Sequence, residues 1–245
     1  MASKILTEQE VRNIGYKGSA TTNLLCTYKR AKDFGCTAVS GVSLSDNQLV
    51  WQGSVKMNYE YVDLGFTDEI AGLKIAKWNL GASSETGTGK FYSWGNVTGY
   101  TEENNHKFTT TEYNSSTGKG LTGNIPVNST YDPAQAELGG SWRLPTAKEF
   151  MLIHFQCYDT RQWTSISGVY GWKLTGPNGN YVFFPACGHC GASGYSKSSN
   201  YYTFYMSSTY SSASDFVGLG IQTNVFAYNG YEARYAGHSV RPVFK

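Results

Sequence analysis

The clearest pattern of apolar and polar positions in the chain begins at residue 146 and has the period of a helix. Thr146 and Glu149 have the spacing of a capping box, which satisfies the first free backbone N–H groups of a helix. Apolar or aromatic side chains then recur at helical spacing: Phe150, Met151, Ile153 and either His154 or Phe155. The pattern therefore predicts a helix here, with His154 in the core.

Two shorter segments also carry helix signals. Asp132 stands before Pro133, which suits the first position of a helix, and the glycine pair at 139–140 predicts where that helix ends. Near the start of the chain, Thr and Glu recur at capping-box spacing in residues 7–10. We therefore expect a further short helix over residues 4–14.

The rest of the chain has the patterns of strands and turns. Three segments rich in Val, Ile, Tyr and Trp predict short strands: YEYVDLGF, GLKIAKWNLGA and KFYSWGNV. Residues 164–186 predict a hairpin with PNGN as its turn, and the polar stretch 99–130 predicts a long surface loop. These elements indicate an α+β protein, with a small docking or oligomerisation module over residues 1–57 and a larger domain over residues 58–245.

Charge and hydropathy exclude some partners. The formal charge is +2, only 16% of residues are charged, and no run of Lys or Arg is present, so we expect no nucleic-acid partner. No run of 18 apolar residues occurs, so we expect no membrane insertion. The first residues lack the pattern of a secretory signal, and an odd number of cysteines, five, argues for reduced or buried thiols. We therefore expect synthesis in a cytoplasm.

The sequence offers little for catalysis or metal binding. Cys187 and Cys190 form C-G-H-C, the spacing of a redox pair or of half a zinc site. No helix signal follows the pair, the other cysteines supply no second C-x-x-C, and no two histidines have metal-ligand spacing. P-loop, dinucleotide and hydrolase motifs are also lacking. We expect no catalytic residues, no metal and no cofactor.

The last 65 residues contain nine of the 19 tyrosines, interleaved with Ser, Gly and Asn. Such mixtures are typical of antibody-like binding surfaces, in which Tyr provides contact area and small polar residues provide hydrogen bonds. We assign Tyr181, Tyr205 and Phe216 to the core. The candidate ligand-binding residues are Tyr201, Tyr202, Phe204, Tyr210, Tyr228, Asn229, Tyr231, Glu232, Ala233, Tyr235, His238 and His189.

Two motifs look structural. Trp142, Arg143 and Pro145 in GGSWRLP, with Arg241 and Pro242 in VRPV, are expected to form a framework. A large indole ring is usually buried, and an arginine beside it can join strands through its several N–H donors.

The order of several segments resembles a known family: WNLGA, FYSWGN, YDPAQAELGGSWRLPTAKEF, GWKLTGPNGNYVFFPA, YMSST and GHSVRPV. Together they resemble the formylglycine-generating-enzyme type of C-type-lectin-like domain found in Bacteroidetes bacteria and their phages. The resemblance covers roughly residues 59–245 and implies that fold. In the family, a stretch ending in S-V-R-P-V is rewritten by diversity-generating retroelements, which implies a variable region at about 187–238. The N-terminal KILTEQEV and DNQLV are similar to a small module of phage structural proteins.

The resemblance implies a receptor-recognition protein on a phage tail or particle, which binds a protein or glycan receptor on a target cell. Location in a virion, or release from the cytoplasm without a signal peptide, fits that role; a cytoplasmic location is the alternative. We expect a homo-oligomer, and a trimer if the likeness to phage fibres holds. Two other functions stay open: a cysteine-dependent oxidase using Cys187 and Cys190, like the family's namesake enzyme, and a structural surface protein. The motif around the namesake's cysteines is not matched here.

Overall fold

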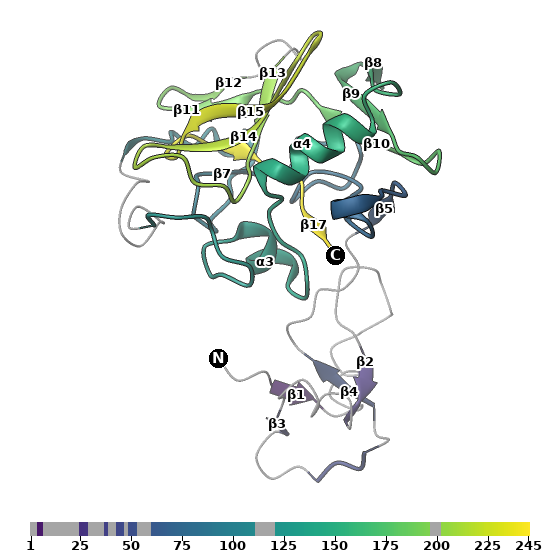
Figure 1. Cartoon of the computed structure of the whole chain (residues 1–245). Helices are drawn as coiled ribbons and strands as arrows, with labels where there is room; N and C mark the ends of the chain where they lie inside the picture. The colour runs from purple at the N-terminus through teal and green to yellow at the C-terminus, as the bar shows by residue number, and fades with distance from the viewer. Residues whose placement is uncertain are drawn as a thin grey trace. The chain divides into compact units, whose positions relative to one another are not determined.

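The structure is a computed structural model that describes residues 4–6, 25–28, 37–38, 43–46, 49–52, 60–110, 121–196 and 202–245. The chain divides into two compact units (Figure 1). One contains residues 1–59 with 138–140, and the other contains residues 60–137 and 141–245.

The first unit contains a four-stranded sheet in the order β2-β4-β1-β3. Its strands are β1 (Lys4–Leu6), β2 (Leu25–Thr27), β3 (Thr37–Ala38) and β4 (Leu49–Gln52). The expectation of a helix over residues 4–14 is wrong at its start, because β1 pairs with both β3 and β4. Residues 7–14 lie outside the described part of the chain.

The second unit contains strands in four sheets and belongs to the expected α+β class. The largest sheet has five strands in the order β15-β14-β13-β16-β7. These are β7 (Phe91–Tyr92), β13 (Tyr202–Tyr205), β14 (Asp215–Gln222), β15 (Val225–Ala233) and β16 (His238–Ser239).

Three smaller sheets and four helical segments complete the unit. The sheets are β17-β6-β5, β10-β9-β8 and β11-β12. Their strands are β5 (Tyr61–Asp63), β6 (Lys74–Ala76), β8 (Gln162–Ile166), β9 (Val169–Thr175), β10 (Tyr181–Pro185), β11 (His189–Gly191), β12 (Gly194–Ser196) and β17 (Val243–Phe244). The helical segments are η1 (Asp68–Ile70), η2 (Glu102–Asn104), α3 (Pro133–Leu138) and α4 (Ala147–Gln156).

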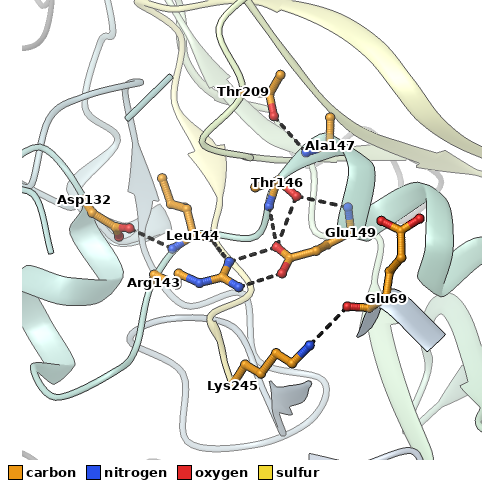
Figure 2. Close-up of polar contacts among 9 residues, drawn as sticks. All are labelled: Glu69, Asp132, Arg143, Leu144, Thr146, Ala147, Glu149, Thr209 and Lys245. Atoms are coloured by element: carbon orange, nitrogen blue, oxygen red, sulfur yellow. Dashed lines mark hydrogen bonds and ion pairs between the residues drawn. The ribbon is translucent and has the colours of Figure 1, made fainter. Parts of the chain in front are cut away.

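The capping box that predicted α4 is confirmed (Figure 2). The Glu149 backbone N–H donates to Thr146 Oγ1 at 3.0 Å, and the Thr146 backbone N–H donates to Glu149 Oε2 at 2.8 Å. Phe150, Ile153 and His154 are buried, as the helical period predicts, whereas Phe155 faces solvent. The reciprocal bonds satisfy donors that the first turn of a helix cannot pair by itself.

The signals for α3 and for the PNGN hairpin are also confirmed. Asp132 accepts the backbone N–H of Ala134 at 2.8 Å, and both glycines after the helix have positive φ. In the hairpin of β9 and β10, the Gly176 N–H donates to Asn180 O at 2.8 Å. Each signal is local, because it satisfies backbone groups within a few residues of itself.

α4 lies against β14 and β15 of the five-stranded sheet (Figure 1), and the core includes side chains from this sheet, from α4 and from β6, β9, β10 and β17. Phe150 and Ile153 of α4 share this core with Tyr205, Leu219 and Ile221 of the sheet. Burial of Tyr205 and Phe216 was expected and is confirmed.

Two expectations about burial are corrected. Tyr181, assigned to the core, is 40% exposed, with Lys173 Nζ 4.2 Å from the centre of its ring. The stretch 99–130 is not wholly a surface loop, because Phe108 and Ile125 are buried. Phe108 packs with Phe91 of the sheet, so this loop is attached to the core by a large apolar side chain.

Of the two framework arginines, Arg241 joins segments that are far apart in sequence, as expected, whereas the Arg143 side chain binds Glu149, six residues along the chain. Arg241 is fully buried and donates to Asn79 Oδ1 at 3.1 Å and to Phe183 O at 2.8 Å. Arg143 makes a two-pronged ion pair with Glu149, at 2.8 and 2.6 Å (Figure 2). The charge of Arg143 and the backbone N–H of Thr146 hold the pKa of Glu149 below its usual value, although burial opposes this shift.

Candidate ligand-recognition surface

The candidate surface lies around β15, an edge strand of the five-stranded sheet. β15 pairs with β14 in an antiparallel ladder, with Tyr231 opposite Val217 and Glu232 opposite Phe216 (Figure 1). The register shifts between Gly218 and Gly220, so β15 carries a bulge near its middle. A bulge at an edge changes the direction in which the following side chains point.

Tyr231 and Asn229 are the most accessible of the expected residues that the structure describes. Tyr231 is 68% exposed, and Asn229 is also exposed. Because β15 is fixed by its ladder with β14, Tyr231 presents an aromatic ring to solvent from an ordered backbone. Such a ring adds contact area with few rotamers to immobilise on binding.

A second part of the surface combines three strands. The Tyr202 hydroxyl on β13 donates to Glu232 Oε1 on β15 at 2.8 Å, and the ring of His189 on β11 lies edge-on to Tyr202 at 6.1 Å. All three side chains are partly buried. Burial, together with the negative charge of Glu232, raises the pKa of Tyr202, so its phenol stays protonated and can donate. This group offers a ligand both polar atoms and ring edges.

Two of the expected residues are buried, and their assignment to the surface is corrected. Phe204 is 3% and His238 is 1% exposed. Their rings lie 5.5 Å apart, and both contact Phe216. Phe204 also lies against glycines in β14 and β15, whose missing side chains leave room for its ring. The sheet is covered on both faces here, so neighbouring residues of β13 are buried although they point to opposite faces.

Two other expected residues lie apart from Tyr231. Tyr228 packs against α4, with its ring 4.9 Å from His154 and 5.7 Å from Phe155. The ring of Tyr210 lies 6.4 Å from Trp94, in a cluster that Arg234 also joins. Both tyrosines are partly buried, so only part of each side chain is accessible to a ligand.

Ala233, the last residue of β15, and Tyr235, which follows the strand, are partly buried. Tyr201 lies outside the described residues. The expected surface is therefore smaller and more divided than its sequence suggested: an exposed part at Asn229 and Tyr231, and a polar part at Tyr202, Glu232 and His189.

Cys157, Cys187 and Cys190 are buried and free. Cys187 accepts the Asn79 side-chain N–H at 3.3 Å and lies 3.6 Å from Ser239 Oγ. Burial raises its pKa and raises the pKa of Cys190 to about 12. Nucleophilic attack and metal binding both need the thiolate, which these surroundings disfavour. The chain after Cys190 forms a strand hairpin, as expected, and not a helix.

The described residues contain no group of three or more His, Cys, Asp or Glu side chains arranged to hold a metal ion. None of the helices in that part of the chain has the length and apolar character needed to cross a membrane.

Sequence reasoning missed one group of exposed side chains, at the end of α4. Phe155 and Tyr158 are both more than half exposed, and Arg161 lies beside them. The exposed position of Phe155 was not evident, because the helical period allowed either Phe155 or His154 to face inward.

Comparisons of this chain with protein-family models, with curated proteins and with solved structures found no match.

Proposed function

We propose that this protein recognises a protein or glycan receptor on a target cell through two groups of side chains at the β15 edge, which point to opposite faces of the sheet: Asn229 with Tyr231, and Tyr202 with Glu232 and His189. The larger domain would be a C-type-lectin-like domain of the formylglycine-generating-enzyme type, with a variable region at about 187–238. The order of sequence segments supports this fold, and the mixed α+β architecture is consistent with it.

The exposure of Tyr231 on an ordered strand is the observation that carries the proposal. Its side chain can change without disturbing the core, because it is 68% exposed and is not one of the residues that form the core cluster. Substitutions at exposed positions usually change stability by less than about 0.5 kcal/mol. A surface with this property can vary its specificity while the backbone stays fixed.

The chemistry of the surface fits a receptor with both apolar and polar groups. The Tyr231 ring would bury apolar area against the receptor. The Tyr202 hydroxyl and the Glu232 carboxylate would form hydrogen bonds with polar groups of the receptor. Aromatic residues in a contact usually provide most of its binding energy.

A binding panel tests the proposal. The full chain is applied to an array of glycans and to bacterial outer-surface proteins, and any ligand found is titrated against Tyr231→Ala. We expect a loss of about 1–3 kcal/mol in affinity, with the melting temperature unchanged. Tyr181→Ala, at another exposed tyrosine that is paired with Lys173, is the matched control and should bind normally.

Equal losses for Tyr231→Ala and Tyr181→Ala would refute the assigned surface. A chain that binds nothing on the panel would favour the alternative of a structural surface protein.

We also propose that the protein is a homo-oligomer on a phage tail or particle, assembled through residues 1–57. Linked copies raise the effective local concentration and can increase apparent affinity by roughly 10² to 10⁴ without new contacts. Light scattering on the full chain and on a chain that starts at residue 58 tests this. A monomeric full chain, or an oligomer that persists after truncation, would contradict it.

A further inference from the structure

Rings and one cation form a continuous group at the end of α4, which we name the Arg161 cluster. Its members are His154, Phe155, Tyr158, Arg161, Trp172 and Tyr228. The His154 ring lies 5.1 Å from Phe155, 5.4 Å from Tyr158 and 4.9 Å from Tyr228. The ring of Phe155 also contacts Tyr228, at 5.7 Å. α4, the turn after it, β9 and β15 therefore share one aromatic surface.

This surface is open to solvent at two large rings. Phe155 is 55% exposed and Tyr158 is 54% exposed, although both have neighbours on one side. Phe155 has no polar atom that water could hydrate. Adjacent exposed aromatic side chains on a folded domain usually mark a site of interaction.

The cation of the cluster is held in place by two rings. The Arg161 guanidinium carbon lies 4.3 Å from the centre of the Tyr158 ring and 5.4 Å from that of Trp172. The Nη1 of Arg161 donates to His154 Nδ1 at 2.5 Å. Stacking on aromatic rings orients a guanidinium before any ligand arrives, so less rotamer entropy is lost on binding.

Arg161 differs from the other arginines of the described chain. Arg143 is paired with Glu149, whereas Arg234 and Arg241 each donate to three backbone carbonyls. Within the described residues, the acceptor for Arg161 is the imidazole of His154, and no carboxylate lies within ion-pair distance.

The charge of the cluster is positive. Burial and the nearby Arg161 lower the pKa of His154, so its imidazole is neutral at pH 7 and Arg161 supplies the charge. Most of the five guanidinium N–H donors are not used by protein acceptors in the described chain. A ligand that complements this surface therefore needs an anion beside apolar groups.

We propose that the Arg161 cluster is a docking site for an acidic segment of a protein partner, in which a carboxylate is flanked by apolar side chains. The carboxylate accepts two parallel N–H groups from Arg161, and the flanking side chains cover Phe155 and Tyr158. Arginine binds carboxylates in this two-pronged geometry, and Arg and Tyr are enriched among residues that dominate protein interfaces.

This inference goes beyond the recognition surface. Five of the six residues lie between 154 and 172, outside the segment 187–238 in which the proposed ligand specificity resides. The docking site would thus take the same partner whatever receptor the variable surface binds.

Two synthetic peptides test the proposal on the full chain. One is acetyl-Leu-Glu-Phe-Asp-Leu-amide, and the other has Gln and Asn in place of Glu and Asp, so it keeps the apolar groups and loses the charges. Binding is followed by calorimetry and by tryptophan fluorescence, since Trp172 lies under Arg161. We expect the acidic peptide to bind about tenfold more tightly or better, because charge-assisted hydrogen bonds are the stronger kind.

Variants separate the charge from the rings. Arg161→Gln should remove the preference for the acidic peptide, and Phe155→Ala should weaken both peptides. Lys173→Gln is the matched control, because it removes a cation that also lies over an exposed ring, that of Tyr181. Circular dichroism verifies that each variant is folded.

Several outcomes would overturn the proposal: no binding of either peptide at millimolar concentration, equal affinity for the two, or equal effects of Arg161→Gln and Lys173→Gln. Tyr231→Ala should leave peptide binding unchanged. Failure of the docking site and failure of the recognition surface are therefore distinguishable.

Discussion

His238 should make the stability of this protein depend on pH in a way that follows from its surroundings. The imidazole is almost fully buried between Phe204 and Phe216, and its Nε2 donates to Ala233 O at 3.1 Å. Burial lowers its pKa from 6.5 to about 4; Glu232 and the Ala233 carbonyl oppose the shift, and His189 adds to it. At pH 7 the side chain is therefore neutral.

The sign follows from the order of protonation. As the pH falls, His238 binds a proton at about 6.5 in the unfolded chain but only at about 4 in the folded one. The stabilisation is fully present above pH 6.5 and is lost progressively down to about pH 4. One pKa unit corresponds to 1.36 kcal/mol, so the total loss is about 3 kcal/mol.

The measurement is urea unfolding of the wild type and of His238→Gln at several pH values between 7.5 and 4. Glutamine can still donate to Ala233 O but does not titrate. His154, whose pKa is also lowered by burial, titrates in both proteins and cancels in the difference. We expect the wild type to lose about 3 kcal/mol more than the variant over this range. Parallel curves would show that a protonated His238 is tolerated in the folded protein, and would refute this reasoning.

Three further predictions concern the framework and the thiols. Trp142→Ala should lower the free energy of unfolding by about 3–5 kcal/mol, measured in urea, because it leaves a cavity. Glu149→Gln should cost about 1.5–3 kcal/mol, whereas Glu69→Gln, in an exposed pair with Lys148, should cost less than about 1 kcal/mol. The thiol of Cys190 should resist iodoacetamide in the folded protein and react in urea, as followed by mass spectrometry; rapid labelling of the folded chain would mean that this thiol is accessible.

The elements that could be predicted from the sequence have causes within a few residues. The capping box at Thr146, the Asp132–Pro133 start and the PNGN turn each satisfy their own backbone groups. Similar logic failed at residues 4–6, where the same capping pattern lies next to a segment that forms β1 and pairs with two distant strands. Pairing between distant segments can override a local helix signal, and a single sequence does not reveal it.

Side-chain burial in the sheet could not be predicted for a different reason. The run of aromatic residues around β13 resembled a binding surface, because a strand with one solvent-facing side should alternate in polarity. Here both faces of β13 are covered: the Tyr205 ring lies 5.1 Å from Phe184 of β10, and the Phe204 ring lies 5.5 Å from His238. The segments that cover β13 are distant from it in sequence. The local pattern of Tyr and Phe therefore does not distinguish a buried strand from a ligand-binding surface.

Tyr228 connects the two surfaces inferred here and limits how independent they can be. It lies in the proposed variable region, three residues before Tyr231, yet its ring packs on His154 and Phe155 of the Arg161 cluster. A variable position that also supports a constant docking site cannot change freely, since residues in contact have coupled energies, whereas well-separated ones are nearly additive. If both surfaces operate, position 228 must keep a ring that packs on α4 while Tyr231 varies. Diversity at the recognition surface would then be confined to side chains that touch no part of the helix.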